Sequence, residues 1–359
     1  MINILCNSQF FHQRFGGVTR YSLCLIERMI NDDIDIKICS PIFKNIYLRN
    51  INKQYIFGKY FTQYPNILFL KFLNNLILNF FLSSKKQNTI HFMYDPEYLY
   101  NVISKKKIIT IHDTIHEKFG SVYNDNFFAK RKKILESMDK IICVSENTKN
   151  DLLNYYDLND DKIEVIYNGS DHLIPINKIE VQTISHNKPY ILYVGSRSKY
   201  KNFKLFIEAY SKSKRLLNNF NILCFGGGKF SKNEIKLLKE LKIVDKINLI
   251  IDNDKVLKSC YQNASLFVYP SLYEGFGISI LEAMNEGCPT LVSEIPVFKE
   301  ILRDKGIFFN PRNIDDLVFN MEKILFDNEV KKNLILNGKN ISKKYSWDEC
   351  YNKTIKLYS

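Results

Sequence analysis

Apolar runs of strand length alternate with helical patterns through most of the 359-residue chain. This alternation is typical of parallel sheets covered by helices on both faces, because strands buried on both sides read as continuous apolar segments. The expected strands are residues 2–6, 36–39, 89–92, 107–111 and 140–144, then 190–194, 221–225, 247–250, 266–269 and 290–292. The expected helices include residues 126–137, 203–211, 232–241 and 278–285.

The length of the chain also bears on its organisation, because 359 residues exceed one typical hydrophobic core. A polar stretch at residues 168–188 breaks both periodicities and is the expected linker. We therefore predict an α/β protein of two doubly wound, Rossmann-like domains, at residues 1–170 and 171–344.

The charge of the chain favours an anionic partner. The net charge is +13 at pH 7, and basic residues cluster at 85–86, 105–107 and 130–133. Such an excess attracts nucleic acid, anionic lipid headgroups or phosphorylated substrates. The grouping predicts a basic face on the N-terminal half.

The eight cysteines are scattered without a C-x-x-C pair, which is typical of reduced thiols and of neither a disulfide framework nor a zinc site. The first residues, 1–5, lack the basic region and long apolar stretch of a secretory signal. We expect a cytoplasmic protein.

Residues 68–82 form an apolar segment with a narrow polar stripe of Lys71, Asn75 and Asn79. The segment is too short and too polar to span a bilayer. Two interpretations stay open. The favoured one is a largely buried helix of the N-terminal domain, since interfacial helices usually carry cations along their polar face. The other is a helix that touches a membrane surface beside lysines.

The densest candidate site lies at residues 273–289, where Glu274 and Glu282 are separated by seven residues. Glu274 stands in a turn with Gly275 and Gly277, and Glu282 falls about two turns into an expected helix. A strand that feeds a glycine turn and a helix start presents backbone N–H groups that favour an anion. Carboxylates beside such a turn can accept hydrogen bonds from hydroxyls, so the site suits a nucleotide sugar.

Two cations follow the expected strand 190–194, namely Arg197 and Lys201. They stand at the C-terminal end of that strand, where doubly wound folds place their ligands. Glycosyl transfer builds negative charge on a diphosphate leaving group, and electrostatic stabilisation of such charge is the largest help a protein gives. Solvated surface cations are the alternative for both residues.

Several segments together resemble the retaining glycosyltransferases of family 4, which have the GT-B fold. The E-x7-E signature is the first, and the others occur in the order that family uses: residues 15–21, 111–113, 143–146, 167–169, and 194–197 with 201–202. The resemblance therefore covers almost the whole chain. One departure is Ser279, where many members have proline; it removes no charged group.

The resemblance implies roles for the acidic and histidine residues. Glu274 would contact hydroxyls of the donor sugar, Glu282 would reach the ribose hydroxyls, and His112 would lie near the donor sugar, with Asp113 orienting its ring. Retention in this family is commonly explained by attack of the acceptor on the same face, so Glu274 is not assigned as a nucleophile. The alternative for His112 is a structural hydrogen-bonding residue.

The resemblance also implies a donor site of backbone groups. Gly16 and Gly17 would let the chain approach the diphosphate, with an ordinary turn as the alternative. Arg20, one turn further on, would either add positive charge there or have a structural role. The turn after Glu274 would hold phosphate or sugar oxygens, through Gly275 and the N–H groups of Phe276, Gly277 and Ile278. The terminal segment, residues 345–359, would pack back on the N-terminal domain.

Two other patterns do not carry function. The run Phe225-Gly226-Gly227-Gly228 lacks the spacing of a dinucleotide fingerprint and is interpreted as a flexible turn. Asp252-Asn253-Asp254 matches a D-x-D metal motif but resembles a turn. The family generally works without a bound metal, so we expect no metal and no cofactor besides the sugar nucleotide.

The leading hypothesis is a retaining hexosyltransferase that uses a nucleotide diphosphate sugar and a lipid-linked saccharide acceptor in O-antigen, capsule or lipopolysaccharide synthesis. Overall similarity favours GDP-mannose or a related hexose, and the basic N-terminal half suits peripheral contact with the inner face of the cell membrane. One alternative is a nucleotide-sugar epimerase of the same fold. Another is a basic nucleic-acid-binding protein, although basic residues do not interleave with aromatic ones.

Overall fold

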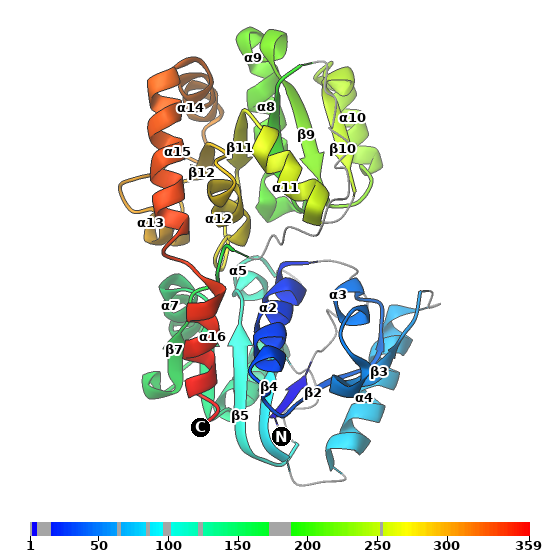
Figure 1. Cartoon of the computed structure of the whole chain (residues 1–359). Helices are drawn as coiled ribbons and strands as arrows, with labels where there is room; N and C mark the ends of the chain where they lie inside the picture. The colour runs from blue at the N-terminus through cyan, green and yellow to red at the C-terminus, as the bar shows by residue number, and fades with distance from the viewer. Residues whose placement is uncertain are drawn as a thin grey trace. The chain divides into compact units, whose positions relative to one another are not determined.

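The computed structural model describes residues 2–5, 16–62, 66–83, 87–95, 102–120, 125–171, 188–251 and 254–359. The chain divides into two compact units (Figure 1). Unit 1 comprises residues 1–168 and 347–359, and unit 2 comprises residues 169–346. Both divisions lie within two residues of the boundaries expected from the sequence.

Unit 1 has a parallel sheet of seven strands in its described part, in the order β3-β2-β1-β4-β5-β6-β7. The strands are β1 (Ile2–Leu5), β2 (Ile36–Phe43), β3 (Ile56–Tyr60), β4 (Gln87–Phe92), β5 (Ser104–Ile111), β6 (Lys140–Cys143) and β7 (Ile163–Val165). All five strands expected in this half are present. The two that the sequence did not predict, β3 and β7, are the edge strands.

The helices of unit 1 follow the strands as parallel connections require. They are α2 (Gly17–Asn31), α3 (Ile46–Arg49), α4 (Ile67–Ser83), α5 (Ile115–Phe119), α6 (Asp125–Glu136), α7 (Glu146–Tyr155) and α16 (Trp347–Lys356). A buried cluster that includes Leu78, Ile90, Ile109, Leu135 and Ile141 joins α4, α6 and the strands between them.

Helix α4 differs from the favoured interpretation of a largely buried helix. Leu70, Asn74, Leu78 and Leu82 are buried, but the opposite face exposes large apolar side chains. The exposed residues and their exposed fractions are Ile67 51%, Leu68 75%, Phe69 60%, Phe72 60%, Leu76 51% and Phe80 82%. The expectation of burial was wrong because the sheet covers only one side of a helix that is apolar nearly all round.

The last helix, α16, lies along α2 within unit 1 (Figure 1). Trp347 is fully buried and packs edge-on against Tyr21, with ring centres 5.9 Å apart. Tyr351 donates a hydrogen bond of 2.5 Å to Asp32. The C-terminal segment therefore completes the core of the unit in which the chain begins.

A buried polar network continues from this segment. The Tyr358 hydroxyl lies 2.6 Å from Nδ1 of His91, and Nε2 of His91 lies 2.8 Å from Oγ1 of Thr110. The Thr110 hydroxyl is also 3.1 Å from the Tyr21 hydroxyl. Burial lowers the pKa of His91 to about 3, with a smaller contribution from the nearby His112.

The described residues of unit 2 form a second parallel sheet, with six strands in the order β10-β9-β8-β11-β12-β13. They are β8 (Tyr190–Val194), β9 (Asn221–Phe225), β10 (Ile247–Ile250), β11 (Leu266–Tyr269), β12 (Thr290–Ser293) and β13 (Ile307–Phe309). The strand order reverses between β8 and β11. Open α/β sheets bind ligands outside the carboxyl ends of the strands at such a reversal.

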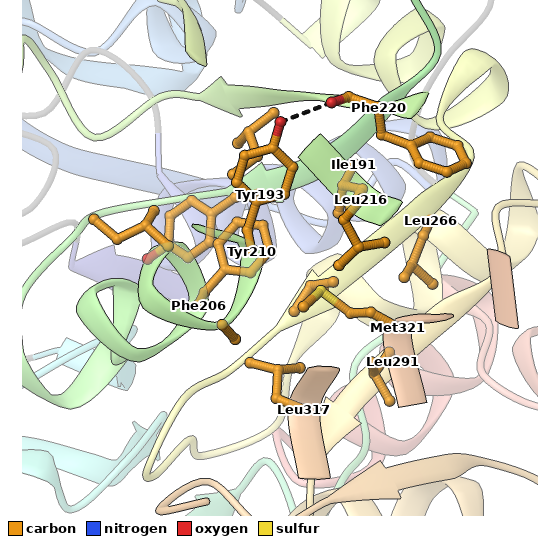
Figure 2. Close-up of a cluster of buried hydrophobic side chains, with 14 of the residues drawn as sticks. Ile191, Tyr193, Phe206, Tyr210, Leu216, Phe220, Leu266, Leu291, Leu317 and Met321 are labelled. Carbon is orange, nitrogen blue, oxygen red and sulfur yellow. Dashed lines mark hydrogen bonds between the residues drawn. The ribbon is translucent and has the colours of Figure 1, made fainter. Parts of the chain in front are cut away.

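The core of unit 2 lies between this sheet and its helices, as Figure 2 shows for Phe206, Tyr210, Leu317 and Met321. Tyr210 is fully buried, and its hydroxyl donates a hydrogen bond of 2.7 Å to the carbonyl of Phe220. The helices are α8 (Phe203–Lys212), α9 (Lys214–Asn219), α10 (Lys232–Glu240), α11 (Asp254–Asn263), α12 (Ile278–Asn285), α13 (Pro296–Leu302), α14 (Ile314–Phe326) and α15 (Asn328–Ser342).

Candidate active site

Two loops of unit 2 meet at the reversal of strand order. One follows β8 and carries Lys201, and the other follows β11 and carries Glu274. The Lys201 ammonium donates a hydrogen bond of 2.5 Å to Oε1 of Glu274. Ser271 donates a second bond of 2.6 Å to the same oxygen. The structure thus brings together two predicted site residues at the place where folds of this kind bind ligands.

This pair is sheltered from solvent, with side-chain exposed fractions of 14% for Lys201 and 9% for Glu274. Burial alone would lower the pKa of Lys201, but the Glu274 carboxylate raises it well above its ordinary value. The lysine is therefore held in its charged form. The neighbouring Tyr269 lies 3.4 Å from the ammonium, and burial raises the pKa of its hydroxyl.

The turn after Glu274 is shaped by glycine. Gly277 has φ of +103°, which side chains rarely allow, and it directly precedes α12. A Cβ at this position would lie 2.9 Å from the Phe298 ring. Phe276 is buried, with its ring 5.8 Å from that of Tyr345. The predicted roles of Gly275, Phe276, Gly277 and Ile278 in holding oxygens of the donor stay predictions.

Arg197 has contacts other than those expected from the sequence. Its Nε donates 2.7 Å to Glu234, and its terminal nitrogens donate to the carbonyl oxygens of Gly226, at 3.2 Å, and Gly228, at 2.8 Å. The guanidinium also lies 4.5 Å from the centre of the Phe230 ring. In the described residues no hydrogen bond joins it to Lys201 or Glu274. Arg197 therefore holds the loop at residues 226–228 through hydrogen bonds, and it is not a free cation beside Lys201.

That loop is the glycine run after β9, predicted to be a flexible turn. Gly226, Gly227 and Gly228 have φ of +79°, +71° and +74°. A Cβ on Gly227 would lie 2.5 Å from the carbonyl oxygen of Gly195, which follows β8. The run is therefore a close-packed turn held by Arg197, at the same end of the sheet as the Lys201 loop.

Glu282 lies deeper than its predicted role requires. It is fully buried on α12, and the Tyr261 hydroxyl donates 3.1 Å to its Oε2. A ribose hydroxyl could reach this carboxylate only if the side chains around it moved. The predicted ribose contact therefore stays a prediction, and in this structure Glu282 joins α12 to α11.

The predicted residues of the first half lie in unit 1. His112 follows β5, and its Nε2 donates 2.9 Å to the carbonyl oxygen of Met93. Its ring packs edge-on to Tyr21, with centres 4.9 Å apart, and burial lowers its pKa. Asp113 does not bond to this ring. Its Oδ1 accepts a hydrogen bond of 3.0 Å from the N–H of Ile115, the first residue of α5. Met93 orients the histidine, contrary to the expectation for Asp113.

The glycines before α2 occupy different environments. Gly16 precedes the helix, and its carbonyl oxygen accepts 2.8 Å from the Thr19 hydroxyl. Gly17 is exposed, and a Cβ there would meet nothing within 4 Å. Their diphosphate contact stays a prediction. Arg20 is buried.

A buried ionic cluster beside His112 was missed in the sequence. Arg131 was grouped with surface lysines, yet it is 5% exposed and pairs with Glu117 at 2.7 Å and Asp95 at 3.4 Å. The Tyr156 hydroxyl donates 2.8 Å to Glu117. A small pocket beside the cluster is lined by Tyr94, Asp95, Thr110, Ile111, His112, Asp113, His116 and Arg131. Only the helical position of Arg131, between apolar residues of α6, could have indicated burial.

No group of three metal-ligating side chains occurs among the residues that the structure describes. Residues 252 and 253 of the D-x-D pattern lie outside the described residues, as does the side chain of Asp254. The expectation of a metal-free reaction stays a prediction.

Family models account for nearly the whole chain. The model "Glycosyltransferase Family 4" matches residues 15–172, and "Glycosyl transferases group 1" matches residues 176–341. The chain belongs to the family 4 glycosyltransferases. These models describe glycosyltransferases; they describe neither epimerases nor nucleic-acid-binding proteins.

Relatives of this glycosyltransferase agree with that assignment. It is 26% identical over 320 residues to the O-antigen chain mannosyltransferase RfbU of Salmonella typhimurium, covering 82% of this chain and 83% of that protein. Its fold is similar to sucrose-phosphate synthase from Thermosynechococcus elongatus, with TM-score 0.79, 18% identity and coverage of 99% and 98%. Anabaena HepE, solved with UDP and glucose, gives TM-score 0.76, 14% identity and coverage of 99% and 98%. The glycosyltransferase therefore has the GT-B fold.

Proposed function

We propose that this glycosyltransferase is a retaining hexosyltransferase that moves a hexose from a nucleotide diphosphate sugar to a lipid-linked saccharide. The observation that carries the proposal is the sheltered pair of Lys201 and Glu274 at the strand reversal of unit 2. A charged lysine there can stabilise the negative charge that grows on a departing diphosphate. Family membership supplies the class of reaction.

In the proposed reaction the bond between the anomeric carbon and the diphosphate oxygen breaks, and Lys201 neutralises the departing oxygen. Glu274 accepts a hydrogen bond from a hydroxyl of the transferred sugar and supports its positive character. The acceptor hydroxyl attacks from the face that the diphosphate leaves and gives its proton to the departing diphosphate oxygen, so the anomeric configuration is retained. No step requires a metal ion.

Surface polysaccharide synthesis is the setting we propose, with the acceptor presented at the cytoplasmic face of the membrane. Support comes from RfbU, whose name assigns it a mannosyl transfer to an O-antigen chain. The same relative supports GDP-mannose as the first donor to test.

The test replaces Glu274 by alanine and measures transfer from labelled GDP-mannose to a membrane lipid extract, with UDP-glucose as a second donor. We expect kcat/KM to fall by about 10²–10³, as for other electrostatic contacts made at the transition state. Glu274→Gln keeps the size of the side chain and separates lost charge from misfolding. The matched control is Glu294→Ala, because Glu294 is an exposed carboxylate that pairs with Lys299.

Transfer at the wild-type rate by both Glu274 variants would refute the role of this residue. Turnover of the sugar nucleotide to an isomeric sugar nucleotide without any acceptor would indicate an epimerase. The anomeric configuration of the product, read by NMR, tests retention separately.

A further inference from the structure

The outer face of α4 is an unusual surface for a protein in water. Leu68, Phe72, Leu76 and Phe80 recur every four residues and so form one stripe along the helix. Their exposed fractions run from 51% to 82%. Large contiguous apolar surfaces mark interaction sites more often than single exposed side chains do.

The orientation of α4 is fixed by its inner face. The Asn74 side chain accepts 2.7 Å from the N–H of Ile42 and donates 3.1 Å to its carbonyl oxygen, which ties the helix to β2. Phe81 stacks on Phe57 of β3, with ring centres 4.0 Å apart. Figure 1 shows α4 at this edge of unit 1, beside β2 and β3. Turning the stripe inward would break these contacts, so it stays outward.

The segment that contains α4 carries only positive charge. No aspartate or glutamate occurs from residue 36 to residue 94, a run of 59 residues. Eight cations lie in it: Lys37, Lys44, Arg49, Lys53, Lys59, Lys71, Lys85 and Lys86. This run therefore supplies +8 of a net charge of +13 for the whole chain.

Two of these cations lie at β3, the strand that precedes α4 in the chain. Arg49 and Lys59 are exposed and stand over the rings of Tyr60 and Phe61, at 5.1 Å and 5.8 Å from the ring centres. Phe61 is itself 40% exposed and precedes Ile67, the first residue of α4, by six positions. A chain of six residues reaches at most about 20 Å, and Phe57 of β3 stacks on Phe81 of α4, so these cations lie at the strand next to α4.

We propose that the outer face of α4 docks the enzyme on a bilayer that contains anionic lipid. Leu and Phe side chains enter the headgroup region while the neighbouring cations bind headgroup phosphates. A second copy of the chain fits this surface poorly, because it would place two carboxylate-free cationic segments against each other. The cations come from β3 and its flanks, whereas membrane-surface helices usually carry them on their own polar face. The inference deepens the proposed function and rests on it for the lipid-linked acceptor.

The test is flotation of the full chain with vesicles of phosphatidylcholine, with and without phosphatidylglycerol. We expect binding to the anionic vesicles that weakens as salt is raised, since salt screens the headgroup contacts. The double variant Phe72→Gln/Phe80→Gln should weaken binding about tenfold or more, because each buried phenylalanine contributes on that scale. Glutamine preserves helix propensity, and both side chains are exposed, so the fold is expected to survive.

The matched control is Phe319→Gln/Leu336→Gln, which removes two apolar side chains that are 64% and 60% exposed on helices of unit 2. This control should bind vesicles as the wild type does. Equal binding by the α4 variant and the control, or no binding by the wild type, would overturn the proposal. So would a wild-type dimer in solution that Phe72→Gln/Phe80→Gln dissociates. Vesicle binding needs neither donor nor acceptor, so its result is independent of whether sugar transfer is detected.

Discussion

His91 is a single buried residue that makes the stability of unit 1 depend on pH. Both of its ring nitrogens are engaged, by Tyr358 and Thr110, in a site without solvent exposure. Its folded pKa of about 3 lies below the value of about 6.5 expected when the chain is unfolded. Between these values the unfolded state binds a proton that the folded state excludes, so stability is lost as pH falls from about 6.5 towards 3.

We therefore predict that unit 1 loses about 1.4 kcal/mol of unfolding free energy per pH unit through His91 below pH of about 6. His91→Asn should flatten that dependence. Trp347 is the only tryptophan of the chain and is buried in unit 1, so its fluorescence in urea titrations follows this unit. His112 acts in the same direction, since burial lowers its pKa too. Parallel pH profiles for wild type and variant would contradict the assignment.

At the scale of elements, the loop after β9 offers a sharp comparison between adjacent glycines. Gly227 and Gly228 share nearly the same φ, +71° and +74°. A Cβ on Gly227 would lie 2.5 Å from the Gly195 oxygen and 2.8 Å from an Arg197 nitrogen, whereas one on Gly228 would meet nothing within 4 Å. Replacement by alanine would therefore strain the backbone at both positions, but only at Gly227 would it also cause a steric clash.

We predict that Gly228→Ala costs about 1 kcal/mol of stability from strain alone. Gly227→Ala should cost about 1–3 kcal/mol more and raise the KM for the donor, because the clash displaces the loops after β8 and β9. Thermal unfolding and donor kinetics measure the two effects. Equal behaviour of the two variants would show that the close approach to Gly195 has no consequence.

The elements also show what a sequence can reveal. Strands such as β8 and β11 are buried along their whole length and were predicted, because continuous apolar runs identify them. Strands β3, β7 and β13 were missed; each is a partly exposed edge strand, and β7 and β13 have only three residues, too few for an apolar run or an alternation to be recognised.

The site divides in the same way. Spacing and position after a strand identified Lys201 and Glu274, which meet across the strand reversal. The spacing of residues in the sequence could not show that Arg197 forms hydrogen bonds with Glu234 and the glycine loop, since those partners are 29 or more residues away. For α4, composition showed an apolar helix, but which of its faces the sheet covers depends on tertiary packing.

At the scale of the whole molecule, unit 1 depends on the last residues of the chain. Trp347 is fully buried there, and Tyr358 bonds to His91 in the sheet. We predict that a chain ending at Ser346 destabilises unit 1 by more than about 3–5 kcal/mol, the usual cost of removing one buried tryptophan. A chain ending at Lys356 keeps Trp347 but loses the contact between Tyr358 and His91 and the hydrogen bond from Lys106 to Ser359, so it should be affected less.

Hydrogen exchange resolved by peptide measures this loss, because amides of α2 and β5 should lose protection while those of β8 and β9 keep theirs. Unchanged protection in unit 1 of the shorter chain would show that α16 is dispensable.

The return of α16 to unit 1 also sets an order of events on the ribosome. Residues 1–168 are made before residues 169–346, but α16, the helix that closes their core, is made only after both. Unit 2 has all of its residues before α16 is made, whereas unit 1 waits for that helix. During translation the half made first is therefore the half that matures second, and a nascent chain stalled before Trp347 would hold one finished domain and one open one.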